Sequence, residues 1–286
     1  MKKYVYLFSE GSSDMGHILG GKGANLAEMT NLNIPVPFGF TISSEACIYF
    51  MNYGKYPPGF KKQVLDSLHC LEKNMKQKFG DRNNPMLVSV RSGARKSMPG
   101  MMETVLNVGL TNDTLIGLIN KTKNERFVYD SYRRLITMYS DVVMEKSNNL
   151  NCDIRKQLEL VLSKIKIKYG LTNDFEISCH QLKNICNKYK KIILQKTKYH
   201  FPDNAEKQLW GSIEAVFKSW NGDRAKHFRK IEKIPDSWGT AVNIQVMVFG
   251  NMNNNSATGV AFTRNPSTGE NVFFGEWLPN AQGEDV

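Results

Sequence analysis

A glycine-rich segment near the N-terminus has the composition of a phosphate-binding loop. Residues Gly20–Gly23 read Gly-Gly-Lys-Gly and precede residues 24–29, which have high helix propensity. Glycines let the backbone turn tightly enough for N–H groups to point at phosphate oxygens, and a helix N-terminus and a lysine add favourable charge. This is not a Walker A loop, because no Ser or Thr follows Lys22 and the first spacing differs. A glycine turn with a surface lysine is the alternative.

A second cluster of charge lies within residues 89–104. Three cations and three hydroxyl side chains fall within nine residues, beside two glycines and a proline. Arg91 follows the β-prone run Met86–Val90, and an arginine with a fixed base can hold phosphate oxygens in bidentate fashion. The adjacent Met101 and Met102 could pack on a flat ring. A basic surface loop is the alternative, although it would not need this apolar pair.

Two further groups are weaker candidates. Arg133 and Arg134 are adjacent in an aromatic helical stretch, so they point in different directions and one can reach inward. In the C-terminal region, β-prone runs could offer main-chain groups to an adenine ring, and carboxylates there could hold Mg²⁺ through oxygen. The polar residues of this region are Gln245, Thr258, Arg264, Glu276, Glu284 and Asp285. Ordinary surface carboxylates are the alternative.

The elements that must position these groups begin with an α/β region. Its predicted elements are strands over residues 4–8, 39–42 and 86–90, a loop at Gly20–Gly23, and a polar loop that begins at Arg91. Ser43 or Ser44 is expected to cap a helix. After Pro57 and Pro58, apolar residues recur at three- and four-residue spacing, which predicts a second helix that Gly80 ends.

Helical periodicity dominates from about Thr111 to Tyr199, and β-prone runs then return. Three strands are predicted over residues 241–249, 258–263 and 271–276, paired as one antiparallel sheet. Because the β pattern still runs at Val286 and such a sheet needs further elements to cover it, we expect the sequence to be a piece of a longer protein. The predicted domains are residues 1–110, 111–200 and 201–286.

Length and composition exclude several classes of protein. The chain has 286 residues, 41% hydrophobic and 23% charged, which is typical of a globular protein with two or three lobes. No run of about 18 uncharged apolar residues is present to span a membrane. The N-terminus lacks the features of a signal or transit peptide, so we expect a cytoplasmic protein. The five cysteines include no C-x-x-C pair, which indicates ordinary reduced thiols.

The net charge of +11 is concentrated in the middle of the chain. Between Lys146 and Lys233, 19 lysines and arginines stand against nine acidic residues. A basic region can face nucleic acid or acidic ligands. Here the lysines are scattered through amphipathic helix, as in Lys164–Lys168, which favours a solvated helical face. A non-catalytic protein that docks on RNA or an acidic partner is the alternative from a different class.

Taken together, five segments resemble the pyruvate, phosphate dikinases. They are residues 19–29 (LGGKGANLAEM), 89–109 (SVRSGARKSMPGMMETVLNVG), 129–145 (YDSYRRLITMYSDVVME), 238–251 (WGTAVNIQVMVFGN) and 258–270 (TGVAFTRNPSTGE), and the ending 280–286 (NAQGEDV) is similar as well. The resemblance covers nearly the whole chain and is weakest over residues 147–200. The form of Ser97–Met102 is similar to the phosphate-using enzymes. Water-using relatives, the phosphoenolpyruvate synthase and phosphoglucan dikinase types, are the alternative within enzymes.

The resemblance implies an α+β fold: an ATP-grasp-like nucleotide-binding domain of several lobes, with a helical middle lobe and an incomplete C-terminal β-rich lobe. It implies ATP and Mg²⁺ as cofactors and a reaction of ATP, phosphate and pyruvate that gives AMP, diphosphate and phosphoenolpyruvate. A phosphohistidine on a separate domain would carry the phosphoryl group. That domain and the pyruvate-binding barrel, through which a homodimer would form, lie outside this sequence. We therefore expect this piece alone to be inactive, with no nucleic acid or membrane as partner.

By motif position, the resemblance also implies roles for individual residues. Lys22 and Arg91 would contact the phosphates of ATP, and Arg134 would support the phosphate-binding site. The adenine pocket would be lined by Met102, Gln245, Val246, Met247 and Val248. The triphosphate and Mg²⁺ would be surrounded by Thr258, Glu276, Glu284 and Asp285. No residue is predicted as a direct metal ligand.

Overall fold

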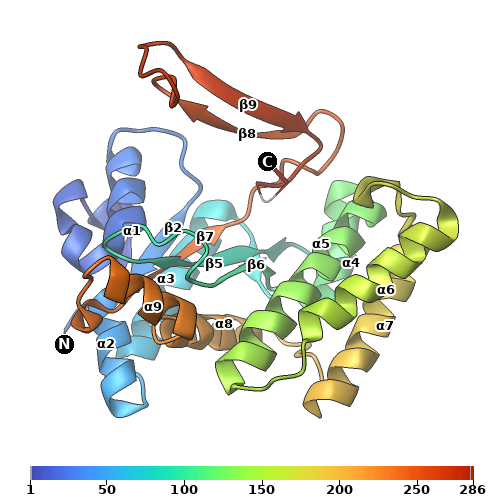
Figure 1. The fold of residues 1–286 in the computed structure, drawn as a ribbon, viewed down its shortest axis with the longest axis horizontal. Coiled ribbons are helices and arrows are strands. Elements are labelled where there is room, and N and C mark those ends of the chain that lie inside the picture. Colours follow the sequence, from blue (N-terminus) through green and yellow to red (C-terminus); the bar gives the residue numbers. More distant parts are fainter. Residues whose placement is uncertain (1, 284) are drawn as a thin grey trace.

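A five-stranded antiparallel sheet forms the centre of the molecule. The computed structural model describes residues 2–283 and 285–286. The strands lie in the order β1 (Val5–Leu7), β2 (Gly39–Ile42), β7 (Ala241–Val246), β5 (Val88–Gly93) and β6 (Thr104–Val108). The middle position therefore belongs to β7, a strand from the C-terminal part of the chain (Figure 1).

Helices cover both faces of this sheet. They are α1 (Gly16–Asn31), α2 (Ser44–Tyr53), α3 (Phe60–Met75) and α8 (Ala205–Ser219), while α9 (Asp223–Ile231) packs in a separate small cluster. Helix α1 packs on β7, β5 and β2, while α8 packs on β5, β6 and β7. Successive residues of a strand point to opposite faces. Accordingly, Asn243 faces Gly23 of α1, and the neighbouring Ile244 lies in the apolar core with α8.

The middle of the chain is helical, as predicted. Its helices are α4 (Asn112–Thr122), α5 (Glu125–Tyr139), α6 (Ile154–Tyr169) and α7 (Cys179–Thr197), and a π-helical turn at Ser140–Glu145 continues α5. Thr111 caps α4 and Asn124 caps α5 with side-chain oxygens that accept from Thr114 N and Phe127 N. Helix α5 packs on both α7 and strand β6, so it joins the helical region to the sheet.

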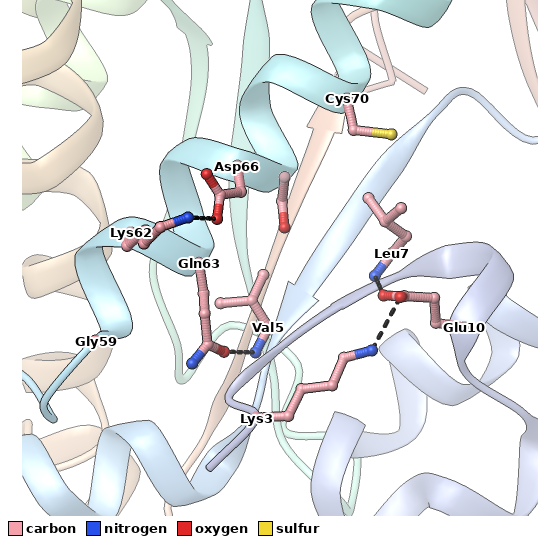
Figure 2. Close-up of a pocket in the computed structure, with 10 residues that line it drawn as sticks. Lys3, Val5, Leu7, Glu10, Gly59, Lys62, Gln63, Asp66 and Cys70 are labelled. Atoms are coloured by element: carbon pink, nitrogen blue, oxygen red, sulfur yellow. Dashed lines mark hydrogen bonds and ion pairs between the residues drawn. The ribbon is translucent and has the colours of Figure 1, made fainter. Parts of the chain in front are cut away.

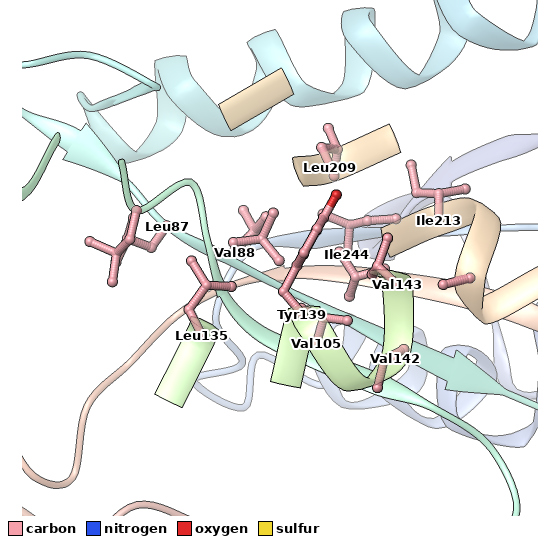
Figure 3. Packing of buried hydrophobic residues seen from close by; sticks show 14 of the residues in the cluster. Leu87, Val88, Val105, Leu135, Tyr139, Val142, Val143, Leu209, Ile213 and Ile244 are labelled. Carbon is pink, nitrogen blue, oxygen red and sulfur yellow. The ribbon is translucent and has the colours of Figure 1, made fainter. Parts of the chain in front are cut away.

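The largest apolar cluster lies between the sheet and helices α5 and α8. Figure 3 shows side chains of both helices, such as Leu135 and Ile213, packed against strand residues such as Val88 and Ile244. All four are fully buried. Full burial of one such side chain stabilises the fold by about 1.5–3 kcal/mol. The sheet, the helical region and the C-terminal helices therefore share one core.

The last two strands form a separate hairpin. Strands β8 (Ala257–Phe262) and β9 (Phe274–Pro279) pair only with each other and stand away from the sheet (Figure 1). Large apolar side chains of this segment are exposed, among them Phe273 at 82% and Trp277 at 68%. The predicted three-stranded sheet over residues 241–276 is thus wrong, because the first of its strands lies in the central sheet. The predicted boundaries at residues 110 and 200 stay a prediction.

Several local predictions also need correction. The predicted loop at Gly20–Gly23 lies inside α1, with a kink at Gly20. Helix α3 ends at Met75 with Lys76 in a left-handed conformation, so Gly80 does not end it. Arg91 does not begin a loop, because β5 continues to Gly93. The remaining short elements are strands β3 (Lys78–Phe79) and β4 (Pro85–Met86), with 3₁₀ turns at Phe8–Glu10, Ser13–Met15, Lys146–Asn148, Asp174–Glu176 and Asp236–Trp238.

Candidate nucleotide-binding site

A kink in helix α1 brings the glycine segment onto the end of strand β5. Gly20 has φ 70° and ψ 169°, a conformation available in practice only to glycine. A methyl group at this position would overlap the carbonyl group of Gly93. Gly21 N donates a hydrogen bond to Ala94 O at 3.0 Å. The glycines therefore allow a close backbone approach between α1 and the segment that follows β5.

The region where these segments meet is a pocket of about 700 Å³. Lys22 and Asn25 of α1 line one wall, and residues 92–100 line the other with Met102. The predicted glycine-lysine segment and the basic segment after Val90 thus lie on two walls of one pocket. Both carry the groups that the sequence predicts for phosphate binding.

Lys22 and Arg91 lie close together beside this pocket. The pKa of Lys22 is lowered, mainly because its surroundings strip water from the ammonium group and also because of the positive charge of Arg91. Lys22 as a whole stays exposed, and Arg91 is half-buried on β5, paired with Asn243 of β7 and Thr104 of β6. Two neighbouring cations, one of which lines a pocket, form an arrangement suited to an anion with several charges.

The far wall of the pocket is held by a small apolar cluster of its own. Met98 and Trp220 are buried in this cluster, and Met102 packs against it. The guanidinium group of Arg95 lies 5.1 Å from the centre of the Trp238 ring, an arrangement that favours a cation–π contact. Beyond the cluster, Lys96 forms an ion pair with Glu232 at 2.6 Å. The sequence analysis did not predict that the α9 region supports this pocket wall, because no local motif indicates such a contact.

The residues predicted to line an adenine pocket do not share one face. The Gln245 side chain is on the α1 side, where its amide donates to Pro37 O at 3.1 Å, whereas Val246 lies in the apolar core. The N–H groups of Val246 and Met247 donate to Phe38 O and Leu87 O. Val248 is 68% exposed, in the connection that leaves β7. An adenine contact by these four residues stays a prediction.

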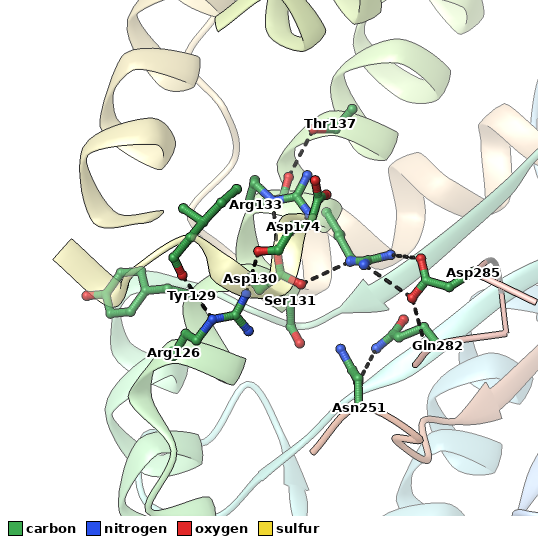
Figure 4. A network of polar contacts seen from close by, with 12 residues as sticks. Arg126, Tyr129, Asp130, Ser131, Arg133, Thr137, Asp174, Asn251, Gln282 and Asp285 are labelled. Atoms are coloured by element: carbon green, nitrogen blue, oxygen red, sulfur yellow. Dashed lines mark hydrogen bonds and ion pairs between the residues drawn. The ribbon is translucent and has the colours of Figure 1, made fainter. Parts of the chain in front are cut away.

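Arg134 belongs to a second polar group, between α5 and the base of the hairpin. Its guanidinium group donates to Asp285 at 3.0 Å and to Asp130 at 3.1 Å. Arg133 binds the same Asp130 at 2.7 Å and Asp174 at 3.0 Å (Figure 4). Burial alone would raise the pKa of Asp130, but the charges and hydrogen bonds of the two arginines lower it overall.

The hairpin carries the remaining predicted residues. Thr258 Oγ1 donates to Ala281 O at 2.7 Å, and Glu276 is exposed on β9. Glu284 lies outside the described residues. Asp285 also accepts a hydrogen bond from Gln282 N at 2.9 Å, and with Arg134 it borders a pocket of about 480 Å³. The structure thus places Lys22 and Met102 at one pocket, with Arg91 close to Lys22, and Arg134 and Asp285 at another.

Another pocket, of about 560 Å³, lies between β1 and α3 (Figure 2). Its polar groups serve the fold: Gln63 Oε1 accepts hydrogen bonds from Tyr4 N and Val5 N, which cover the outer edge of the sheet. Lys62 is paired with Asp66 at 2.7 Å. These contacts indicate a structural role, so this pocket is not the candidate site.

The chain matches a known protein family over nearly its whole length. Residues 16–58 and 57–286 match the sequence profile of a family of nucleotide-binding domains, described as pyruvate phosphate dikinase, AMP/ATP-binding domain. The chain belongs to this family. The matched range includes both walls of the pocket.

Curated relatives carry a fuller name. The chain is 48% identical over its whole length to pyruvate, phosphate dikinase of Clostridium symbiosum and 49% identical to that of Rhizobium meliloti (strain 1021). A third relative, at 49% identity over 99% of the chain, is the chloroplastic pyruvate, phosphate dikinase of Mesembryanthemum crystallinum. The matches cover 32%, 32% and 30% of these relatives, so the chain spans about a third of their length.

Proposed function

We propose that this chain is the ATP-binding part of a pyruvate, phosphate dikinase. The overall reaction would convert ATP, phosphate and pyruvate into AMP, diphosphate and phosphoenolpyruvate, reversibly. The observation that carries the proposal is the meeting of Lys22 on α1 and Arg91 on β5 beside one pocket. Membership of an AMP/ATP-binding family supports the nucleotide as ligand.

In this proposal the phosphates of ATP lie between the two walls of the pocket. Lys22 and Arg91 neutralise phosphate charge, and the rigid base of Arg91 in the sheet orients the phosphate chain. Met102, which borders the same pocket, packs on the adenine ring. Phosphoryl transfer demands little covalent chemistry from the protein and much positioning and charge stabilisation. These residues supply both.

The acceptor of the phosphoryl group is proposed to be a histidine on a separate domain, as the resemblance implies. Arg134 would support the orthophosphate that takes the other phosphoryl group. We propose further that the β8–β9 hairpin belongs to an ATP-grasp-like lobe, with Thr258, Glu276 and Glu284 near the triphosphate. Dimerisation through a barrel domain and a cytoplasmic location stay predictions, since bacterial and chloroplastic relatives both match.

Mg²⁺ is implied by the family, but the described residues do not form a site for it by themselves. Among residues 2–283 and 285–286, no three His, Cys, Asp or Glu side chains gather in a way that could hold a metal ion. Asp285 is ion-paired with Arg134, and Glu276 is exposed on β9. We therefore derive no step of the reaction through a metal ion.

Among residues 2–283 and 285–286, none of the helices has the length and apolar character of a membrane span.

The test of the proposal is diphosphate formation by a protein of the relatives' length that contains this chain. We expect continuous diphosphate formation only when ATP, orthophosphate and pyruvate are all supplied, because without pyruvate the histidine can be phosphorylated only once. If the protein makes phosphoenolpyruvate from ATP and pyruvate without orthophosphate, and no diphosphate is released, the proposal is contradicted and a water-using enzyme is indicated. The 286-residue chain alone is expected to form no phosphoenolpyruvate.

A further inference from the structure

We propose that Asn243 is a positioning residue for the nucleotide pocket. Its carboxamide occupies the space that two glycines leave open, one on α1 and one at the end of β5, and so sets the separation of the two pocket walls. The geometry is independent of any ligand, whereas the choice of ATP as the probe rests on the proposed function.

The oxygen of the carboxamide lies against helix α1. Asn243 is fully buried in the central strand β7, and its Oδ1 accepts a hydrogen bond from Thr41 Oγ1 at 2.8 Å. A methyl group on Gly23 would lie 3.0 Å from this Oδ1 and 2.9 Å from the Thr41 side chain. Helix α1 can therefore pack this close to the sheet only because residue 23 is glycine. This close packing also fixes the position of the preceding residue, Lys22.

The nitrogen of the same carboxamide lies against the other wall. A methyl group on Gly93 would approach Asn243 Nδ2 to 2.6 Å, while its other near neighbours would be at ordinary distances of 3.6 and 3.7 Å. Gly93 is the last residue of β5 and has no left-handed backbone conformation that would require glycine. Asn243 is thus the one tight neighbour that a side chain at position 93 would meet.

The hydrogen bond to Thr41 fixes the orientation of the carboxamide and so directs Nδ2 toward Gly93. Within the described residues, this buried Nδ2 has no hydrogen-bond partner. A buried donor without an acceptor is unfavourable, so no hydrogen bond offsets the cost of burying this amide nitrogen. What it does provide is volume between the glycine of one wall and the glycine of the other.

A double-mutant rescue tests this role. Gly93→Ala alone should weaken ATP binding by about tenfold, because the new methyl group pushes the wall away from Asn243. Asn243→Ala alone should weaken ATP binding to a similar extent, because it leaves a cavity between the walls. In Gly93→Ala/Asn243→Ala, the methyl group enters the vacated space, and ATP affinity should return to within about threefold of wild type. The matched control, Gly93→Ala/Ile244→Val, changes the opposite face of β7 and should not rescue.

A second ligand separates positioning from general damage to the fold. If Asn243 acts by placing Lys22 against the Arg91 wall, affinity for AMP, with one phosphate, should fall much less than affinity for ATP in each single variant. Equal losses for both nucleotides, or a double variant no better than the weaker single variant, would overturn the inference. If the wild-type protein binds no ATP, the proposed function fails instead. In that case the thermal unfolding midpoints of the wild type, the two single variants and the double variant are compared instead. A double variant with a midpoint near that of the wild type supports the spacing role, and a double variant no better than the single variants refutes it.

Discussion

Lys22 on α1 and Arg91 on β5 lie close together, so that the charge of Arg91 adds to the larger effect of desolvation in lowering the pKa of Lys22. The two residues come from segments far apart in the sequence: Lys22 follows the kink of α1 at Gly20, and Arg91 lies within β5. Neighbouring like charges repel each other, and a polyphosphate would relieve that repulsion. The two cations are therefore expected to be more favourable with a polyphosphate bound than without one.

A pH dependence follows from the lowered pKa of Lys22. In the free protein Lys22 loses its proton below the ordinary lysine value of 10.5, whereas bound phosphates would favour the charged form and raise its pKa. Between these two pKa values, ATP binding should take up a proton, and ATP affinity should decline as the pH rises. Calorimetric titration in buffers of different ionisation enthalpy measures this uptake. The Lys22→Met variant should show none of it, and an unchanged proton uptake in this variant would contradict the assignment.

The same substitution should separate stability from binding. A lysine with a lowered pKa in the folded state destabilises the fold below that pKa, and this effect fades as the pH rises toward 10.5. Lys22→Met should therefore unfold at a slightly higher temperature at neutral pH while binding ATP about tenfold to a hundredfold more weakly. Thermal unfolding and nucleotide titration of the same sample test both directions.

Asp130 should be a major contributor to the stability of the helical region. Its carboxylate is buried between Arg133 and Arg134, and its loss would leave two arginines without their shared partner. Asp130→Asn should lower the free energy of unfolding by about 3–5 kcal/mol, measured by denaturant titration. Asp66→Asn removes an exposed ion pair with Lys62 and should change it by less than about 1 kcal/mol.

The acid sensitivity of the protein offers a check on the same group. Because the folded-state pKa of Asp130 is lowered, its ionised form stabilises the protein above the unfolded value of about 3.9, and this contribution is lost as the pH falls through the folded-state pKa. The stability of the wild-type protein should therefore fall more steeply below about pH 4 than that of Asp130→Asn. Parallel acid profiles would show that Asp130 does not carry this effect.

Two glycines with similar φ angles should respond very differently to substitution. Gly20 (φ 70°) faces the carbonyl of Gly93, whereas Gly100 (φ 72°) has no atom within 4 Å of the place that a methyl group would take. Gly20→Ala should cost more than about 3 kcal/mol of stability and abolish ATP binding, since it adds overlap to backbone strain. Gly100→Ala should cost about 1 kcal/mol, the strain alone. Similar losses in the two variants, measured by denaturant titration, would contradict the close approach of α1 to β5.

The sequence identified two segments whose local composition suits phosphate. Gly20–Gly23 and the segment after Val90 both have residues that suit phosphate, and the structure places them on two walls of one pocket. The periodicity of residues 111–199 also predicted the helical region correctly. These signals are local, because glycine content, charge and helical spacing act over a few residues.

What the sequence did not predict depends on contacts between distant segments. β7 pairs with β2 and β5, which precede it by a large part of the chain. The residues of a strand alone do not predict which other strands it pairs with. The same holds for Asn243, which reads as one polar residue in an apolar run until its neighbours across the sheet are known. The support of the pocket wall by Trp220 and Trp238 is likewise invisible to local patterns.

The most direct test of the account is the affinity of the protein for ATP after removal of Arg91, the cation next to Lys22. Arg91→Ala should raise the dissociation constant for ATP by about tenfold to a hundredfold, with Arg91→Lys intermediate because a lysine cannot bind two oxygens in a fork. Lys62→Ala, in the pocket beside β1, serves as the control of equal charge change and should bind ATP like wild type. If Arg91→Ala binds ATP as tightly as Lys62→Ala does, the pocket between α1 and β5 is not where the protein holds the nucleotide phosphates.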